Sequence, residues 1–565
     1  MNDTLRIVPA AYRRRGLRVA ATLLVRAALN LVGLAMLLPV LALTLDPRSL
    51  DGDGLLARVY DALGFASPRA FALAVCGAVV AVIVLKCLAN LWLARIERRY
   101  IYDLYRTLSR RLFTAYHDRG LPFVKSANSA VLTRNVNVVC LAFAAGVLKP
   151  AAAIASEAML LVLLFGALTL YAPLAAGMAL MVFLPATWLY YRVVRNRIDR
   201  YGQDENRAQR EKARIVAETF RGYADLELSG AFELMLRRFD RAMEEVIRTR
   251  SREAGIAQLP PVLTEIGLAA GIALLAALSF GAGEGRTQLL FGVFAVAALR
   301  LMPSVRSILA AWTTLRYNRY TIDILGDAAA DTLAAAPDAA TTATLPFEHQ
   351  IAVRGLTFRF PDDGHVLFRD LDLTIRKGER LGIRGPSGSG KTTLFNLLTG
   401  LYEPTCGTIL IDGTPLTPAN RRAWQNRLGY VSQHLFLTDG TFAENVALGA
   451  SHVDRKRIAE ALDAARLGDF IASLPRGMDT RVGECGCRLS GGQRQRIGIA
   501  RALYRRADVL FFDEATSALD SQTEEEINRA IGQLARRNPG LTLLVIAHRE
   551  TSLAACDRIV TMGKE

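Results

Sequence analysis

A glycine-rich run in the second half of the 565-residue chain has the residue types and the spacing to hold a phosphate group. It reads Gly385-Pro386-Ser387-Gly388-Ser389-Gly390-Lys391-Thr392 and matches the P-loop pattern G-x-x-x-x-G-K-[ST]. Its glycines allow backbone N–H groups to turn toward phosphate oxygens, and a helix that starts there adds partial positive charge. Lys391 can then reach the β- and γ-phosphates, and the Thr392 hydroxyl can ligate Mg²⁺. The run therefore indicates binding of a nucleoside triphosphate.

The residues around this run predict the strand and the helix that a P-loop needs. Arg380-Leu381-Gly382-Ile383 is typical of a strand that enters the loop, and residues 393–398 are typical of a helix that leaves it. Further on, Val509-Leu510-Phe511-Phe512 has the pattern of a buried strand and ends in Asp513 and Glu514. Asp513 is expected to hold Mg²⁺, and the neighbouring carboxylate can polarise an attacking water.

Further motifs follow in the order found in ABC transporters, and the whole chain resembles that superfamily. Leu489-Ser490-Gly491-Gly492-Gln493 resembles the signature motif, and Gln433, at the end of Gly429-Tyr430-Val431-Ser432-Gln433, resembles the Q-loop. Ser517-Ala518-Leu519-Asp520 is similar to the D-loop, and His548 is similar to the switch histidine. Residues 481–486 resemble a loop specific to exporters, and Phe360 stands where the family more often has a base-stacking tyrosine.

The resemblance implies ATP and Mg²⁺ as cofactors and a site that two chains share. It assigns catalysis to Glu514, His548 and Gln433, and it assigns Mg²⁺ to Thr392, Gln433 and Asp513. The residues that it assigns to nucleotide binding are Phe360, Gly385, Pro386, Ser387, Gly388, Ser389, Gly390, Lys391, Thr392, Thr393, Leu489, Ser490, Gly491, Gly492 and Gln493. In the family, ATP lies between the P-loop of one domain and the signature of another. One such domain per chain implies a homodimer or a heterodimer, and the intact motifs favour a homodimer.

Six apolar stretches precede residue 320, and each is close to or longer than the ~20 residues that cross a bilayer. They cover residues 17–45, 70–93, 139–170, 174–194, 257–280 and 289–315. The links 95–137 and 195–252 are arginine-rich and helical in pattern, which places them and both termini in the cytoplasm. We therefore predict a multi-pass membrane protein whose helices extend into the cytoplasm as rods. Six such stretches before one ATPase domain resemble a type I ABC exporter half-transporter, and this resemblance implies a bacterial inner membrane. The remaining loop, residues 46–69, is predicted to lie outside the cytoplasm, and this outer loop carries a short helical pattern at 55–63.

An Ala/Asp/Thr/Pro-rich stretch marks the domain boundary. We predict a transmembrane domain over residues 1–325, a linker over 326–346 and an ABC nucleotide-binding domain over 347–565. The predicted fold class is an α-helical membrane domain of six transmembrane helices, followed by an α/β P-loop ATPase domain. The net charge of +16 reflects arginines beside apolar runs, which indicates membrane topology rather than nucleic acid as a partner. The seven scattered cysteines favour reduced thiols without a zinc site.

Several ionisable residues fall inside the apolar stretches, where charge is costly. Those expected near the inner boundary, where a long side chain can snorkel, are Arg26, Lys149 and Arg306. Those expected near the middle of the bilayer are Lys86, Glu157, Glu265 and Arg300. Lys86 and Arg300 either contact an anionic substrate or form salt bridges with Glu157 or Glu265, and the residues alone leave both interpretations open.

A second resemblance bears on the substrate. Residues 298–304 through Arg316-Tyr317, the outer-loop helix, Lys86 and Glu265 are similar to bacterial flippases of lipid-linked oligosaccharides used in protein glycosylation. Pro260-Pro261 departs from that pattern, because a basic residue is expected in the fifth stretch. The implied function is ATP-driven flipping of a polyprenyl-diphosphate-linked oligosaccharide to the outer leaflet, with Lys86 and Arg300 as candidate contacts. The alternative is a general lipid, drug or amphiphile exporter, and a non-transporting ABC protein is a further rival that the intact Glu514 argues against.

Overall fold

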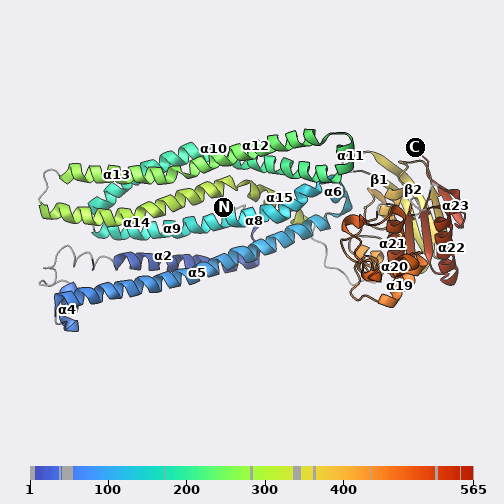
Figure 1. Cartoon of the computed structure of the whole chain (residues 1–565), viewed down its shortest axis with the longest axis horizontal. Coiled ribbons are helices and arrows are strands. Elements are labelled where there is room, and N and C mark those ends of the chain that lie inside the picture. Colours follow the sequence, from blue (N-terminus) through green and yellow to red (C-terminus); the bar gives the residue numbers. More distant parts are fainter. Residues whose placement is uncertain are drawn as a thin grey trace. The chain divides into compact units, whose positions relative to one another are not determined.

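The chain forms two compact units in the computed structural model (Figure 1). One unit comprises Met1–Asp118 and Ala127–Ala335, and the other comprises Arg119–Ser126 and Ala336–Glu565. The structure describes residues 7–36, 40, 55–65, 67–171, 173–279, 284–334, 345–360, 364–433, 435–515, 520–547 and 549–563.

The described part of the first unit consists of helices and contains no strand. Its long helices are α2 (Ala10–Ala35), α5 (Pro68–Asp118), α9 (Lys149–Tyr171), α10 (Pro173–Arg221), α12 (Phe232–Ala257), α13 (Leu259–Ser279) and α14 (Glu284–Tyr317). Its shorter helices are α4 (Leu55–Leu63), α7 (Ser129–Arg134), α8 (Cys140–Phe143), α11 (Tyr223–Leu228) and α15 (Tyr320–Ala334). Two π-helical turns, η2 (Asn135–Val139) and η3 (Ala144–Leu148), join α7, α8 and α9 into one continuous rod.

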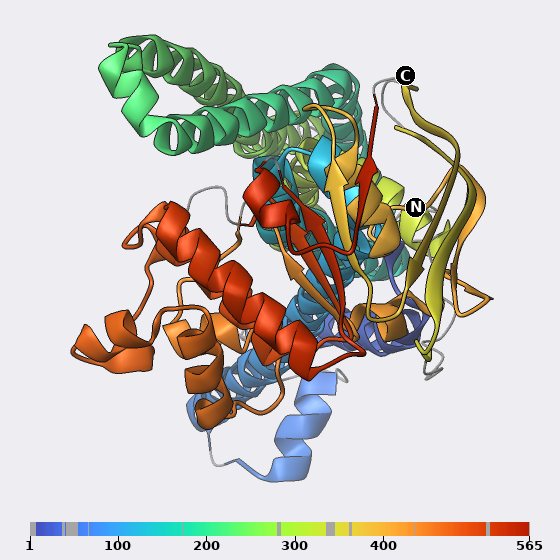
Figure 2. The same ribbon diagram turned by 90° about the vertical axis from the view of Figure 1, so that its right-hand side faces the viewer.

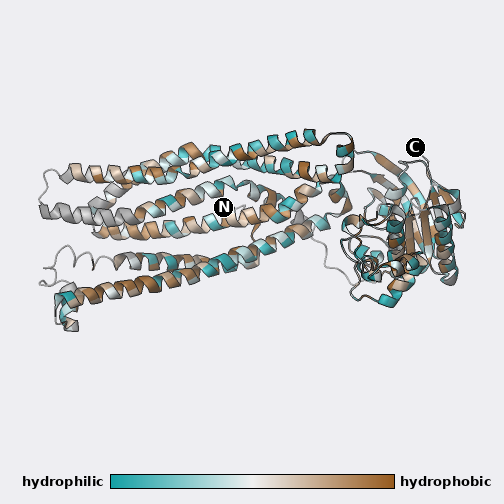
Figure 3. Cartoon of the chain, viewed as in Figure 1, coloured by the Kyte–Doolittle hydropathy of each residue, from teal (hydrophilic) through white to brown (hydrophobic). Residues whose placement is uncertain are grey.

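Several of these helices are much longer than a bilayer is thick. α5 has 51 residues and α10 has 49, so each is roughly 75 Å long, against about 30 Å for the hydrocarbon core. Figure 3 shows α5 strongly hydrophobic in the half next to α4 and more hydrophilic toward its other end. Large apolar side chains are exposed on the first part of α5, as expected of a lipid-facing surface: Leu73, Val80, Val84, Leu85, Leu88 and Trp92. The predicted helical membrane domain with long rods is confirmed.

Within the described residues, four helical segments are long and apolar enough to cross a membrane. They are Ala10–Gly33, Pro68–Asp118, Ser129–Leu170 and Phe232–Ala273. Each overlaps one predicted stretch, namely 17–45, 70–93, 139–170 and 257–280. The predicted stretches 174–194 and 289–315 lie in α10 and α14, which include side chains outside the described part of the chain. The number of six spans therefore stays a prediction.

The second unit is built on two β-sheets. The four-stranded sheet has the order β2-β1-β4-β5 with antiparallel pairs, and the five-stranded sheet has the order β6-β7-β8-β3-β9 with parallel pairs. The strands are β1 (Gln350–Arg359), β2 (Val366–Arg376), β3 (Arg380–Arg384), β4 (Cys406–Ile411), β5 (Thr414–Pro415), β6 (Leu428–Val431), β7 (Val509–Asp513), β8 (Thr542–Ile546) and β9 (Arg558–Thr561). Because parallel strands end at the same edge of a sheet, β3 and β7 bring the P-loop and Asp513 together there.

Helices cover the sheets of this unit. They are α6 (Gly120–Ser126), α16 (Lys391–Leu398), α17 (Arg421–Gln425), α18 (Phe442–Val446), α19 (Arg455–Ala464), α20 (Gly468–Ser473), α21 (Gly491–Tyr504), α22 (Ser521–Arg537) and α23 (Glu550–Leu553). Figure 2 shows α22 in red on one side of the parallel strands and the yellow strands β1 and β2 on the other. Beneath the P-loop, the rings of Phe395 on α16 and Phe511 on β7 meet edge to face, with their centroids 4.9 Å apart. This contact fixes the helix that leaves the loop against the central strand.

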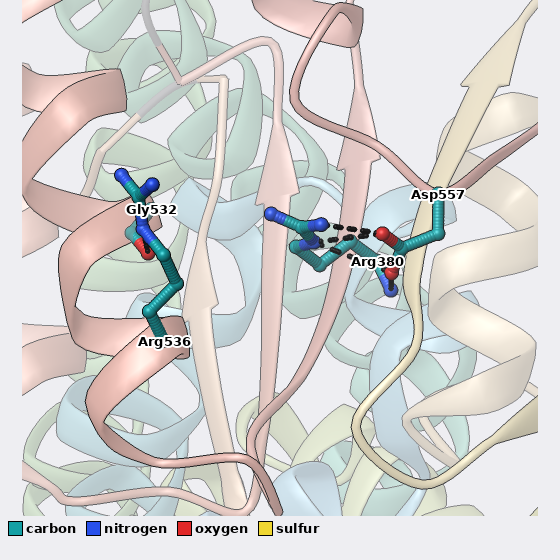
Figure 4. Close-up of polar contacts among 4 residues, drawn as sticks. All are labelled: Arg380, Gly532, Arg536 and Asp557. Carbon is teal, nitrogen blue, oxygen red and sulfur yellow. Dashed lines mark hydrogen bonds and ion pairs between the residues drawn. The ribbon is translucent and has the colours of Figure 1, made fainter.

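An ion pair joins the strand that enters the P-loop to the last strand of the sheet (Figure 4). Asp557, just before β9, accepts hydrogen bonds from the Arg380 backbone N–H at 2.9 Å and from Arg380 Nε at 3.1 Å. Arg536, also drawn in Figure 4, turns back to the carbonyl oxygen of Gly532 on its own helix at 3.3 Å. The pair of Arg380 and Asp557 holds the edge strand β9 beside β3.

Candidate nucleotide-binding site

The P-loop lies where β3 ends and α16 begins, as its sequence predicts. Gly388 and Gly390 adopt φ angles of +83° and +88°, in the left-handed region that side chains with a Cβ rarely enter. A Cβ added to Gly390 would lie 2.7 Å from Cζ of Phe368. These two glycines let the backbone turn sharply, so that N–H groups at the start of α16 can face a bound anion.

Lys391 is buried at the centre of this loop. Its Nζ donates hydrogen bonds to the carbonyl oxygens of Gly385 at 2.9 Å and Pro386 at 3.0 Å. Ser389 is buried beside it, and its Oγ has no hydrogen-bond partner among the described atoms. A buried hydroxyl without a partner is costly, and a phosphate oxygen would supply the acceptor that Ser389 lacks. The loop therefore fits a phosphate group.

Asp513 stands at the end of β7 and is almost fully buried. Its Oδ1 accepts a hydrogen bond from Thr392 Oγ1 at 3.1 Å, and its Oδ2 accepts one from the Tyr430 hydroxyl at 3.1 Å. Burial raises the pKa of the Asp513 carboxyl, and the two hydrogen bonds oppose that rise by favouring the ionised form. A carboxylate beside a hydroxyl is the oxygen donor set that Mg²⁺ prefers, so Thr392 and Asp513 are suited to hold this ion.

Glu514 follows in a left-handed conformation, with φ of +49°. Its backbone N–H donates to the carbonyl oxygen of Ile546 on β8 at 3.0 Å, and this bond to the neighbouring strand holds the unusual backbone. Gln433 Nε2 donates to Glu514 Oε2 at 2.9 Å. The structure therefore brings together two of the three residues predicted to act in catalysis, although 81 positions separate them in the sequence.

The signature motif forms the start of α21. Ser490 is the N-cap, and its side chain accepts a hydrogen bond from the Gln493 backbone N–H at 3.2 Å. In return, the Gln493 side chain accepts from the Ser490 N–H at 2.8 Å, which completes a capping box. Leu489 is buried in the surrounding apolar core. Within the described chain, Leu489 thus anchors the motif in the core, and the Gln493 side chain caps the helix. Gly491 and Gly492 form the first turn of this helix, whose positive end suits phosphate.

The remaining predicted nucleotide residues lie around the same loop. Phe360 is half-buried at the end of β1, and its ring meets that of Phe358 with centroids 5.2 Å apart. Pro386 and Ser387 are exposed in the loop, and Thr393 is half-buried in the first turn of α16. His548 and residues 517–519 of the D-loop lie outside the described residues.

Tyr430 is a residue of this site that the motifs do not assign. Its hydroxyl reaches Asp513 because β6 pairs with β7 in parallel, which sets Tyr430 opposite Phe511. Burial and the negative charge of Asp513 both raise the pKa of Tyr430, so the phenol stays a hydrogen-bond donor at neutral pH. The strand pattern of residues 428–431 is visible in the sequence, but the order of the strands is not.

The candidate substrate residues lie on the helices of the first unit. Lys86 is half-buried on α5, and among the described side chains it forms no ion pair with Glu157 or Glu265. Glu157 instead accepts a hydrogen bond from Ser304 at 2.7 Å, and Glu265 is exposed. The side chain of Arg300 on α14 lies outside the described part of the chain.

Among the cations expected to snorkel, Arg26 has a protein partner. Its Nη1 lies 3.3 Å from Glu97 Oε2, which joins α2 to α5. Lys149 and Arg306 are exposed.

A phosphate-binding loop with a Mg²⁺-type aspartate, in a chain that carries long apolar helices, defines a membrane-embedded ATPase. Residues 368–517 match the family model described as ABC transporter. The fold is that of an exporter: the structure titled "Structure of a bacterial Atm1-family ABC exporter with ATP bound" matches with a TM-score of 0.77. That match covers 98% of this chain and 94% of the other, at 24% sequence identity.

Similar sequences place the chain in a family. The "ATP-dependent lipid A-core flippase" of Ralstonia nicotianae is 33% identical over 391 residues, which is 67% of this chain and 64% of that relative. The protein of the same name from Bordetella avium is 33% identical over 401 residues, which is 70% of this chain and 67% of the relative. The matched region thus spans about two thirds of the length of these relatives. The chain belongs to the ABC transporters.

Proposed function

We propose that this chain is half of an ATP-driven exporter that turns a glycolipid with a phosphorylated headgroup from the inner to the outer leaflet of a bacterial inner membrane. The substrate that we propose is a polyprenyl-diphosphate-linked oligosaccharide, as in the flippases that the sequence resembles. A lipid A-type glycolipid is the second candidate, because the relatives described above are named lipid A-core flippases. Both candidates combine an apolar tail, a glycan and phosphate charge.

The geometry of the nucleotide site supports the hydrolytic part of this proposal. Lys391 is placed to neutralise the β- and γ-phosphates, and Asp513 with Thr392 would hold Mg²⁺, which shields phosphate charge when bound. Glu514 would orient or deprotonate the attacking water, and the hydrogen bond from Gln433 fixes the direction of that carboxylate. His548 is the further catalytic residue that we propose on the family resemblance.

Apolar surface at the tip of the second long link supports a homodimer. Around α11, the side chains of Phe220, Tyr223 and Leu228 are 74%, 61% and 89% exposed. Neighbouring large apolar side chains in such a place indicate a docking surface. We propose that this tip binds the ATPase domain of a second copy, and that Ser490 of one copy faces the P-loop of the other.

The position of Lys86 is the single observation that carries the proposed substrate class. A Cβ added to Gly33 on α2 would lie 2.5 Å from Lys86 Cδ and 2.9 Å from Nζ, so the lysine packs directly against a glycine of the neighbouring helix. A lysine in an apolar helix costs at least ~2.5 kcal/mol at mid-membrane and faces the interior or a partner. Because Lys86 has no acidic partner among the described side chains, its charge is available for a diphosphate.

A second group of charges lies on the helices of the same unit. Arg26, Arg98 and Lys149, together with Glu97 and Glu157, line a cavity of about 260 Å³. Three cations and two carboxylates leave a net positive charge, which suits an anionic headgroup that enters from the cytoplasmic side.

The substrate proposal can be tested by removing the Lys86 charge and, separately, by displacing Lys86 with its charge kept. Gly33→Ala should displace the Lys86 side chain, whereas a Cβ at Gly77 on the same helix as Lys86 would meet nothing within 4 Å. We expect Lys86→Ala to reduce glycolipid flipping in proteoliposomes about 10- to 100-fold, since a charge-assisted hydrogen bond contributes ~1.5–3 kcal/mol. Gly33→Ala should reduce flipping partway and Gly77→Ala should not, while basal ATPase activity stays close to wild type in all three.

The choice of substrate is decided by which purified lipid stimulates ATP hydrolysis and is flipped. Stimulation by the polyprenyl-diphosphate glycolipid alone supports the primary proposal, and stimulation by lipid A-type glycolipids supports the second candidate. Equal stimulation by phospholipids and drugs would assign the general exporter instead. Arg300→Ala belongs in the same series, and unchanged flipping in both Lys86→Ala and Arg300→Ala would exclude an anion path through these residues.

A further inference from the structure

The helical unit contains a cavity, lined by several charged side chains, that none of the roles above uses. It has a volume of about 680 Å³, within the range of small-molecule sites. Its walls come from α7 and η2, the second half of α10, the end of α12 and the start of α15. Counted along the helices from the predicted membrane stretches, the charged lining residues lie roughly 7–40 Å beyond those stretches. The cavity therefore belongs to the cytoplasmic rods and not to the membrane.

The charges that line this cavity are unbalanced. It contains the cations Arg134, Lys212, Arg221 and Arg250, but Glu205 is its only acid among the described residues. Glu205 is fully engaged, because Oε1 accepts from Arg250 Nε at 2.6 Å and Oε2 accepts from the Tyr317 hydroxyl. One carboxylate thus balances one of the four cations.

The other cations have no acidic partner in the described structure. Arg221 donates to the neutral Ser129 hydroxyl at 2.8 Å, and Lys212 forms no ion pair within 4 Å there. Arg134 is 9% exposed and shares a hydrogen bond with Tyr320. Its Nη1 is buried without any hydrogen-bond partner. A buried charged donor in this state is costly unless an anion completes its bonding.

We propose that this cavity binds the phosphorylated sugar part of an amphiphile from the cytoplasmic side, with Arg134 and Lys212 on the phosphate. Asn137, Gln209 and Asn318 also line it and supply amide groups that can donate to and accept from sugar hydroxyls. As an account of substrate capture, the inference rests on the proposed function, because a glycolipid headgroup is the ligand considered there. A free sugar phosphate has the same chemistry, so the experiment separates the two sources.

The first arm measures protection of Lys212 from acetylation in the full-length protein in detergent. Glucose 1-phosphate is the soluble probe, ATP is omitted, and acetylation is read by peptide mass spectrometry against the exposed Lys456. We expect the probe to protect Lys212 and not Lys456. Arg134→Gln should raise the probe concentration for half protection about 10- to 100-fold. Arg207→Gln, at an exposed residue of α10 outside this cavity, should change nothing.

The second arm repeats the measurement in liposomes that contain either a diphosphate-linked glycolipid or phosphatidylglycerol. Protection by the glycolipid alone assigns the site to a lipid headgroup, and protection by glucose 1-phosphate without glycolipid protection assigns it to a soluble sugar phosphate. If Arg134→Gln does not fold, Lys212→Gln replaces it, and the shift in Tm caused by the probe is the readout.

The proposal is overturned if neither probe protects Lys212, or if Arg134→Gln is protected as well as the wild type. These results are independent of transport. If the glycolipid is flipped but does not protect Lys212 from acetylation, the cavity site alone is refuted. A protected Lys212 without flipping of any glycolipid would keep the site and refute the proposed function.

Discussion

Tyr430 allows a sharp test of the nucleotide site, because only its hydroxyl takes part. That hydroxyl donates to Asp513 Oδ2 at 3.1 Å, and Tyr430→Phe removes the bond while keeping the ring. A hydrogen bond to a charged group contributes ~1.5–3 kcal/mol. Since 3.1 Å is longer than the ~2.5–2.7 Å usual for an O–H donor to a carboxylate, we take the lower end, about 1.5 kcal/mol.

This loss should appear in the pH dependence of ATP hydrolysis. Burial already raises the pKa of Asp513, and the bond from Tyr430 lowers it by favouring the ionised form. Removing that bond should therefore move the pKa further up, by about one pH unit for ~1.4 kcal/mol. A protonated Asp513 cannot ligate Mg²⁺, so activity should fall off at a higher pH than in the wild type as the solution is acidified.

The assay is the ATPase rate across the acid limb at saturating ATP, with the Mg²⁺ concentration varied at each pH. Tyr402→Phe is the matched control, because Tyr402 is a buried tyrosine of the same unit whose ring stacks on Phe358, 5.4 Å between centroids. We expect the acid limb of Tyr430→Phe alone to shift by about one pH unit, with a higher Mg²⁺ requirement on that limb. Superimposed acid limbs for the two variants and the wild type would refute the role of the Tyr430 bond.

Three further predictions follow from the second unit. Glu514→Gln should bind ATP normally and lose turnover at least ~100-fold, as expected for a general base; wild-type rates of phosphate release would assign the base elsewhere. Lys391→Ala should bind ATP weakly, yet a mixture of Lys391→Ala and Ser490→Arg chains should recover ATP-driven closure at one site per dimer, measured by cross-linking. No recovery would count against a shared site in a homodimer. Hydrogen bonds from Arg380 lower the pKa of Asp557, so this pair stabilises the fold above the unfolded pKa near ~3.9 and the effect is lost as the pH falls through the folded pKa. Asp557→Asn should therefore lower the stability at pH 7 by less than ~1 kcal/mol, because the pair is partly exposed, and the difference in Tm should narrow near pH 3. A constant difference at both pH values would mean that the charge of Asp557 does not matter.

The parts of the nucleotide site that the sequence predicts are those in which neighbouring residues act together. The P-loop, the strand before it and the aspartate after a buried strand each depend on a short run of residues. Their local sequence patterns are therefore sufficient to predict them. Gln493 shows the limit of such a motif: the signature assigns it to nucleotide binding, while the structure uses its side chain to cap α21. The spacing of Ser490 and Gln493 fits the capping-box pattern, and this signal could have indicated that role.

The contacts that the sequence does not predict depend on strand order and on helix rotation. Tyr430 reaches Asp513 only because β6 is the neighbour of β7, and no motif encodes that adjacency. The hydrogen bond between Gln433 and Glu514 depends on the same adjacency, because Gln433 follows β6 and Glu514 follows β7.

The partners of the charged residues in the apolar helices could not be predicted from the sequence. In a membrane helix most faces are apolar, so hydrophobic periodicity does not reveal which way a charged residue points. The sequence therefore separates Arg26 from Lys86 by their expected depth in the bilayer, but it does not show which of them has an acidic partner. In the structure, Arg26 is paired with Glu97, whereas Lys86 lies against Gly33 and has no acid partner among the described side chains. Since a paired cation has little charge left for a ligand, Lys86 is the stronger candidate to bind the diphosphate of the proposed substrate. Gly33→Ala tests that assignment, because it should displace the Lys86 side chain while its charge stays unchanged.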